Sequence, residues 1–356
     1  MNIELKAPTA RNYPFLKFLY EAVREGYSVN ERDYEDSCQR LNLDGREHLS
    51  TWIEWDGKRL FFDLSDHAFL WNLDALDCCD VYFKANLHWG IASKYLHSEL
   101  LNEHRHKIAP FLLFAPDLAQ LNRTRWLYRL AAFGQTFEVC QIVGVYRNHI
   151  QAATELLDHL PAGCNPDAYH FWVRYLTHRH LSDSRTRAFT RLTSKGQPEQ
   201  EDGLVIYPSV NKYAFFQKIA ASRFQFVNIL PHALLPWKAT EGFALDVPLI
   251  LDHAPLMEQP VGFELSEGDH YLSLFGKRFD FDATAAVEDP ASYRILEPIP
   301  RESWRDAFEI LLEQVMDPQR YAHLKQQVQL YRKTRLTSEN LCKTLLHYLG
   351  LSKNPS

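Results

Sequence analysis

The stretch that decides the fold runs from Arg223 to Asp252 and reads RFQFVNILPHALLPWKATEGFALDVPLILD. Apolar and aromatic residues dominate its two ends, 224–229 and 247–251, and short runs of this kind are typical of buried strands. Lys238 to Leu245, which lie between these runs, have the pattern of a short helix. A strand, a helix and a second strand in this order favour a parallel sheet, so the sequence predicts an α/β protein.

Further elements are predicted on both sides of this stretch. Residues 136–146 read as a buried strand, and a helical pattern over 150–160 follows it. Nearer the N-terminus, Asp56-Gly57 separates two β-rich runs and supplies the positive φ angles that a tight hairpin turn needs. The remaining predicted elements are helices at 14–25, 210–222, 302–315, 318–335 and 338–349, the last with Ser338 as N-cap, strands at 51–55, 59–63, 77–84 and 204–207, and an apolar run over 108–115.

The chain length predicts more than one domain. A single hydrophobic core stops growing at roughly 250–300 residues, and this chain has 356. We expect an N-terminal α/β domain over residues 1–135, a C-terminal α/β domain over 136–335, and a final helix and tail over 336–356. The polar segment 194–203 is interpreted as a surface loop of the second domain.

The composition excludes several classes of protein. The net charge of −6 gives no basic footprint, so a nucleic-acid partner is not expected. Six scattered cysteines without a CxxC pair indicate a reducing compartment. The N-terminal residues do not resemble a secretory signal, and no run of 18 apolar residues predicts a membrane span. The expected location is the cytoplasm, with peripheral contact to the inner face of the membrane left open.

The predicted helix at 238–245 offers an anion site. Its N-terminus follows a strand, and the free N–H groups and dipole of such an end favour phosphate. Lys238 and Glu241 are three residues apart and therefore share one face of the helix. The lysine can pair with phosphate, and the carboxylate can accept hydrogen bonds from ribose or hexose hydroxyls.

The same residues resemble the donor-binding half of glycosyltransferases with the GT-B fold, particularly the exostosin-like and α1,3-fucosyltransferase-like kinds. The resemblance covers about residues 204–275 and is carried by Ser222 to Phe226 and by Lys238 to Ile250. Asp246 stands where these families usually have Gly, and Asp tolerates the left-handed backbone of a helix C-terminus. Lys238 stands where Arg is common, which replaces a bidentate group with a point charge. The segments DVYFK at 80–84 and DHYL at 269–272 are also similar to segments of such enzymes.

The resemblance implies two Rossmann-like domains that face a cleft, with C-terminal helices, and an enzyme of polysaccharide biosynthesis. Such an enzyme transfers a sugar from a nucleotide-sugar donor to a hydroxyl of a glycan or glycolipid acceptor, without a bound metal or cofactor. Residues 1–135 would then bind the acceptor and residues 136–335 the donor. The expected donor-binding residues are Lys238, Glu241, Arg147 and Lys84.

The general base is expected from the loops that follow the N-terminal strands. Asp66 and its neighbour His67 follow the run 59–63, and His88 follows Tyr82-Phe83-Lys84, so Asp66 and His88 are the candidate catalytic residues. The pairs His104/His106 and His178/His180 lack the further carboxylates or cysteines that complete a metal site, so no metal is expected. Two alternatives remain: a non-catalytic scaffold of the same shape that binds carbohydrate or protein, and an unrelated phosphate-ester hydrolase.

Overall fold

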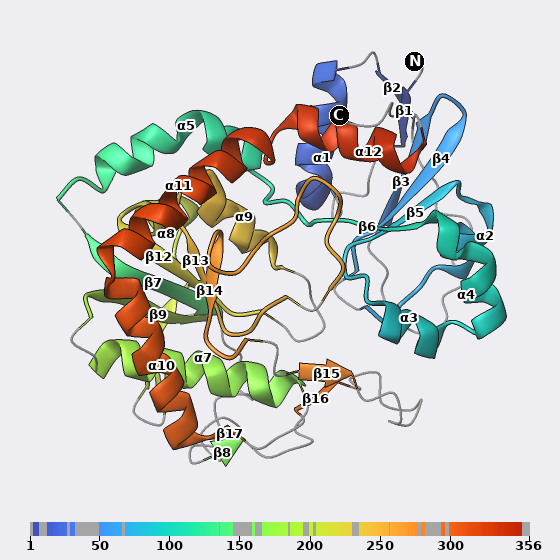
Figure 1. Ribbon diagram of the computed structural model, residues 1–356. Coiled ribbons are helices and arrows are strands. Elements are labelled where there is room, and N and C mark those ends of the chain that lie inside the picture. The colour runs from blue at the N-terminus through green and yellow to red at the C-terminus, as the bar shows by residue number, and fades with distance from the viewer. Residues whose placement is uncertain are drawn as a thin grey trace.

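The chain folds around two β-sheets, one from each half of the sequence (Figure 1). The computed structural model describes residues 3–6, 13–26, 29–32, 50–65, 68–134, 136–144, 159–160, 166–183, 186–194, 199–201, 204–229, 235–255, 257–276, 279–281, 293–295 and 299–350. The first sheet uses residues between 3 and 110, and the second uses residues between 137 and 273. The α/β class and the two-sheet architecture predicted from the sequence are therefore confirmed.

The first sheet has the strand order β2-β1-β3-β4-β5-β6. Its strands are β1 (Ile3–Lys6), β2 (Val29–Arg32), β3 (Ser50–Trp55), β4 (Lys58–Asp63), β5 (Val81–Lys84) and β6 (Ile108–Pro110). β3 and β4 form the predicted hairpin, and Asp56 and Gly57 in its turn have φ angles of 49° and 78°. β4, β5 and β6 are parallel, so their carboxyl ends share one edge of the sheet.

The second sheet has the order β10-β11-β9-β7-β12-β13-β14. Its strands are β7 (Phe137–Gly144), β9 (Ala188–Ser194), β10 (Glu199–Glu201), β11 (Leu204–Pro208), β12 (Ser222–Val227), β13 (Leu249–Leu251) and β14 (Tyr271–Ser273). All pairs are parallel except that of β10 with β11. Without β10, the parallel strands counted in chain order run 3-2-1-4-5-6, which is the Rossmann order. The order reverses between β7 and β12, and ligands of such sheets bind at this switch point.

Helices cover both faces of the second sheet because its central strands are apolar on both sides. In β12, Phe224 and Phe226 pack with Trp172 of α7, whereas Val227 packs in the other main cluster with Phe216 of α8. α10 lies on the face of α7, and α5 and α9 lie on the face of α8. These helices are α5 (Leu118–Ala131), α7 (Pro166–Asp183), α8 (Lys212–Ala220), α9 (Trp237–Ala244) and α10 (Arg301–Met316).

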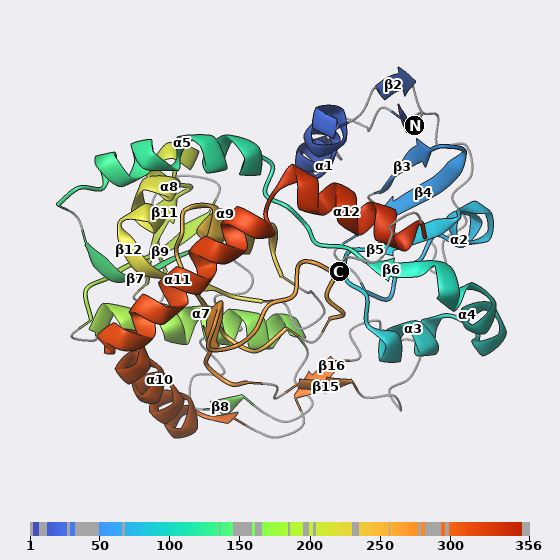
Figure 2. The same ribbon diagram turned by 45° about the horizontal axis from the view of Figure 1, so that its top comes forward.

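The C-terminal helices return the chain to its first half. α11 (Pro318–Thr334) crosses the second sheet, and α12 (Ser338–Tyr348) packs on α1 (Tyr13–Gly26), as Figures 1 and 2 both show. The Cys342 thiol lies 3.6 Å from the carbonyl oxygen of Ala22 in α1. The N-cap of α12 is Thr337, whose hydroxyl accepts from the Asn340 N–H, and not Ser338 as the sequence suggested. The boundaries expected at 135 and 335 stay predictions.

Several local predictions were wrong. Asp77 and Cys78 belong to α2 (Leu73–Cys78), because Asn72 caps this helix by accepting from the Ala75 N–H. The apolar run at 108–115 is a strand only as far as Pro110. Of the helix expected over 150–160, residues 150–158 lie outside the described residues, and His159–Leu160 form the short strand β8. The other short elements are α3 (Trp89–Tyr95), α4 (Ser98–His104), β15 (Phe279–Phe281), β16 (Tyr293–Ile295) and β17 (Ile299–Pro300), and β15 pairs with β16 and β17 with β8.

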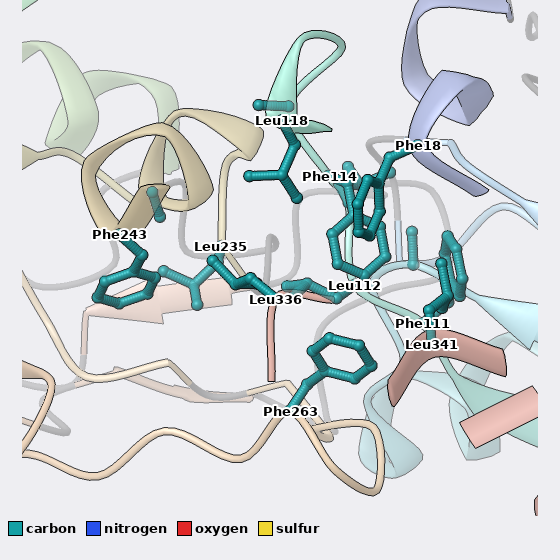
Figure 3. Packing of buried hydrophobic residues seen from close by; sticks show 14 of the residues in the cluster. Phe18, Phe111, Leu112, Phe114, Leu118, Leu235, Phe243, Phe263, Leu336 and Leu341 are labelled. Carbon is teal, nitrogen blue, oxygen red and sulfur yellow. The ribbon is translucent and has the colours of Figure 1, made fainter. Parts of the chain in front are cut away.

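One hydrophobic core joins the two halves (Figure 3). Phe114, which follows the first sheet, contacts Phe18 of α1 at 4.8 Å and Phe263 of the second half at 5.3 Å between ring centroids. Leu235 and Phe243 from the region of α9 belong to the same cluster. The Ala115 N–H also donates to the Thr240 hydroxyl across the junction, at 2.9 Å. The relative position of the two sheets is therefore fixed by packing.

Truncating this junction should destabilise the whole chain. Phe114→Ala leaves a cavity among buried side chains, and we expect it to lower the free energy of unfolding by about 3–5 kcal/mol. Phe133→Ala is the matched control, because Phe133 is 90% exposed and its removal should change stability very little. Urea denaturation followed by circular dichroism measures both, and equal midpoints for the two variants would contradict a shared core.

Candidate functional site

A cavity of about 190 Å³ lies between the two halves at the switch point of the second sheet. Asn86 and Leu113 line it from the first half, after β5 and β6. The rest of the described wall comes from the ends of β7 and β12, from α7 and from the start of α9, and consists of Ile142, Val143, Arg174, Gln225, Phe226, Val227, Asn228, Leu235, Pro236, Trp237 and Lys238. The carboxyl ends of parallel strands from both sheets thus meet at one pocket.

The N-terminus of α9 opens onto this cavity. Its N-cap is Pro236, which provides no side-chain acceptor, so the N–H groups of the first turn are not capped by that residue. Pro236, Trp237 and Lys238 all belong to the cavity wall. A helix end of this kind carries a partial positive charge and favours binding of an anion.

Two cationic side chains lie at the same end of the cavity. Lys238 is partly buried, and its pKa is lowered by burial and then by the neighbouring Arg174, while Glu241 acts in the opposite direction. Arg174 comes from α7 and donates to the carbonyl oxygen of Gly144 at 2.6 Å, which ties it to the end of β7. Two positive charges close enough to depress a lysine pKa would be stabilised by a bound anion.

Glu241 lies behind this wall and does not belong to the described lining of the cavity. Only 1% of its surface is exposed, and burial raises its pKa to about 8. Its Oε2 atom has no hydrogen-bond partner among the described residues. The sequence predicted direct contact between Glu241 and donor hydroxyls, whereas the structure puts Glu241 one helical turn inside α9, next to the charge of Lys238.

Asn228 is a wall residue that the sequence analysis missed. Its amide nitrogen donates to Oδ2 of Asp252 at 3.4 Å, and Oδ1 of Asp252 accepts from the backbone N–H groups of Ile229 and His253 at 2.8 and 3.1 Å. This contact fixes the orientation of the amide, and Asn228 Oδ1 is left without a partner among the described residues. In the sequence, only the position of Asn228 could have identified it, because Asn228 and Asp252 each follow a buried strand directly. The fixed oxygen is a candidate acceptor for a hydroxyl or N–H group of a ligand.

Lys84, predicted to bind the donor, is instead part of the core of the first half. It is fully buried and donates to Asp63 Oδ2 at 2.8 Å, to the Ser65 hydroxyl at 2.9 Å and to the Leu70 carbonyl oxygen at 2.7 Å. These acceptors satisfy the three hydrogens of the ammonium group, so Lys84 cannot bind phosphate without breaking a buried ion pair. That prediction was wrong.

The expected catalytic residues are not brought together by the described part of the chain. His88 is the N-cap of α3, and its Nδ1 atom accepts from the Ile91 N–H at 3.4 Å. From the same loop it is Asn86, and not His88, that lines the cavity. Asp66, its neighbour His67 and Arg147 lie outside the described residues, so their roles stay predictions.

The prediction for Asp246 is confirmed. It has a φ of 58° at the end of α9, which is the left-handed backbone expected there. Its carboxylate is buried and pairs with Arg332 at 2.5 Å and Arg129 at 2.8 Å, with Arg125 at 3.7 Å. The side chain that replaces the usual glycine therefore also binds α9 to α5 and α11.

The histidine pairs make separate contacts. His104 pairs with Asp77 at 3.3 Å, His180 pairs with Glu309 at 3.1 Å, and His178 Nδ1 lies 2.8 Å from the Thr190 hydroxyl. Within the described residues no group of three or more His, Cys, Asp or Glu side chains is arranged to hold a metal ion. The described helices include none with the length and apolar character needed to cross a membrane.

The chain is similar in structure to several solved proteins, whereas no protein-family model and no curated protein matches it. HepE from Anabaena, in complex with UDP-glucose, is 10% identical over 78% of this chain and 67% of its own, with a TM-score of 0.40. The catalytic domain of starch synthase IV from Arabidopsis thaliana, bound to ADP and acarbose, is 13% identical over 76% of this chain and 56% of its own, with a TM-score of 0.37. An α-glucosyltransferase in complex with UDP-glucose and DNA is 11% identical over 78% and 67%, with a TM-score of 0.34. Similarity at this level does not show a function.

Burial of Glu241 predicts a pH-dependent stability. Its pKa is about 8 in the folded chain and close to the ordinary 4.5 in the unfolded chain, so the unfolded state loses this proton first as pH rises. The contribution of Glu241 to stability is therefore complete below about pH 4.5 and is lost as pH rises to about 8, by up to about 1.4 kcal/mol per pH unit.

Glu241→Gln should remove this dependence. We expect the variant to lose less stability than the wild type between about pH 6 and about pH 9, as measured by urea denaturation at each pH. Glu339→Gln is the control, because Glu339 is exposed and its pKa is lowered by Lys343. Parallel pH profiles of the wild type and Glu241→Gln would show that the carboxyl is not desolvated.

Proposed function

We propose that this protein is a glycosyltransferase that binds a nucleotide-sugar donor in the cavity at the N-terminus of α9. The observation that carries the proposal is the position of this cavity at the reversal point of a 3-2-1-4-5-6 parallel sheet, with a helix N-terminus and two cations in its wall. Sheets of this order bind nucleotides at that point. The matching residues Lys238 to Ile250 support a donor site of the exostosin-like or α1,3-fucosyltransferase-like kind.

The diphosphate of the donor would lie against the N-terminus of α9. Lys238, Arg174 and the N–H groups of the first turn would share its negative charge, and the same groups would stabilise the nucleoside diphosphate as it leaves. Because these groups already provide positive charge at the phosphates, we expect the transfer to proceed without a bound metal. Glu241 would act on the phosphate indirectly, through the protonation state of its neighbour Lys238.

The remaining wall would orient the nucleoside and the sugar. Asn228 Oδ1 would accept from a hydroxyl or a base N–H, since Asp252 holds the amide with this oxygen turned away from its own carboxylate. The acceptor would enter from the first half, where Asn86 and Leu113 complete the cavity. We propose a hydroxyl of a glycan or glycolipid as the acceptor, with Asp66 or His88 as the base.

Titration calorimetry with UDP, GDP, TDP and CMP tests the donor site. We expect at least one nucleoside diphosphate to bind, and Lys238→Gln to weaken its binding by about 10–100-fold, because hydrogen bonds to charged groups contribute about 1.5–3 kcal/mol. Lys343→Gln is the matched control, because Lys343 is exposed and pairs with Glu339 on α12. Failure of all four nucleotides to bind would overturn the proposal, and tight binding with no sugar transfer to any glycan would favour the non-catalytic scaffold.

Asn228→Ala should also lower the affinity for the nucleotide, but through a part of the ligand other than the diphosphate. The loss is expected for the complete nucleotide and not for inorganic diphosphate, because Asn228 is assigned to the nucleoside or the sugar. Asp252 keeps its two backbone donors in this variant, so the fold should be retained. Competition experiments with diphosphate and with the nucleotide separate the two effects, and equal loss for both ligands would contradict this assignment.

A further inference from the structure

The outer side of α5 exposes an unusual concentration of large apolar side chains. Trp126, Leu127, Leu130 and Phe133 are 57%, 44%, 64% and 90% exposed. Trp126, Leu130 and Phe133 follow one another by four and three residues, so they form a single stripe along the helix and its C-terminal end. The other large apolar residues exposed in the described part of the chain are Tyr213, Val261, Ile310, Met316 and Leu330, and no two of them lie within one helical turn.

The charged side chains of α5 are all positive. From Leu118 to Ala131 the helix contains three arginines and no Asp or Glu. Arg123 is exposed and lies three residues before Trp126, so it borders the stripe. Arg125 and Arg129 meet Arg332 at the single carboxylate of Asp246, which leaves an excess of two positive charges beside the helix.

This local charge contrasts with the chain as a whole, which has a net charge of −6. A basic helix on a chain of negative net charge would orient the molecule toward an anionic partner with this helix foremost. Figures 1 and 2 both show α5 at the outer edge of the molecule, where a planar surface can reach it.

We propose that α5 docks the protein on an anionic lipid surface. Trp, Phe and Leu on one side of a helix, with the exposed Arg123 beside them, match the interfacial region of a bilayer, where rings and aliphatic chains enter the acyl boundary and a guanidinium group meets lipid phosphate. The four exposed apolar side chains are also far fewer than the roughly 20–30 residues per partner that a stable protein–protein interface uses. The membrane face is here defined as Arg123, Trp126, Leu127, Leu130 and Phe133.

Docking through this face would bring the cavity close to the lipid. Asp246, which binds Arg129 of α5, lies just beyond the C-terminal end of α9, and the N-terminus of α9 opens on the cavity. Eight residues of helix span only about 12 Å. This consequence rests on the proposed function, whereas the docking itself does not.

Co-sedimentation of the purified full-length chain with vesicles tests the docking. We expect binding to vesicles that contain phosphatidylglycerol, weaker binding to phosphatidylcholine alone, and release as salt is raised. The variant Trp126→Ser/Leu130→Ser/Phe133→Ser should bind at least about tenfold more weakly, and Arg123→Gln about fivefold more weakly. Ile310→Ser/Leu330→Ser is the control, because it removes apolar side chains that are 58% and 54% exposed elsewhere on the surface, and it should bind like the wild type.

Three results of the vesicle assay would overturn the proposal. The wild type could fail to bind anionic vesicles, the triple variant could bind them as well as the wild type, or the control variant could lose as much binding as the triple variant. The competing explanation is that two copies of the chain associate through this face, and sedimentation velocity without lipid tests it. A dimer that the wild type forms and the triple variant does not would assign this face to a protein contact. Nucleotide calorimetry on the triple variant keeps the two proposals separate, because the donor site should be unaffected.

Discussion

The structure depends on the very close approach of α9 to the second sheet. Gly242 makes this approach possible, since a Cβ atom at this position would lie 2.4 Å from Gln225 Oε1 and 2.8 Å from Leu249 Cδ2. Any larger residue would displace the Gln225 and Leu249 side chains or push the helix away from β12 and β13. Either change would alter the cavity, because Lys238 of α9 and Gln225 of β12 both belong to its wall. α9 is also held at Thr240, whose hydroxyl accepts a hydrogen bond from the Ala115 N–H, and just beyond its C-terminal end, where arginines surround Asp246.

This approach also explains why charge is buried behind the cavity. A helix held so close to the sheet has little solvent around its first two turns, and Glu241 is desolvated there although Lys238 lies one turn away. Burial raises the carboxyl pKa and lowers the lysine pKa, so each group is driven toward its neutral form. The protonation of such a pair depends on any charge that binds at the N-terminal end of the helix. An anion bound there would be favoured by the ammonium form of Lys238 and opposed by ionised Glu241.

The sequence was informative where the deciding contacts are local. The turn at Asp56-Gly57, the strand–helix–strand unit around α9 and the left-handed backbone of Asp246 all follow from residues close together in the chain. The failures at the candidate site concern partners distant in sequence. Lys84 looked like a free cation, but Asp63 is its register partner on the neighbouring parallel strand, and only strand pairing reveals that. Arg174 and Asn228 could not be identified as site residues from the sequence for the same reason, because α7 and the end of β12 come together at the cavity only in the folded chain.

The shared core limits how the cavity can work. In a protein with two independently packed domains, a ligand can close the cleft by rotating one domain against the other. Here Phe114 contacts rings from both halves, and α12 packs on α1 after α11 has crossed the second sheet. A rotation of one sheet would expose several of these side chains, each costing about 1.5–3 kcal/mol. The wall formed by Asn86 and Leu113 is therefore held opposite α9 before any ligand arrives, and specificity must come from the side chains of a largely preformed cavity.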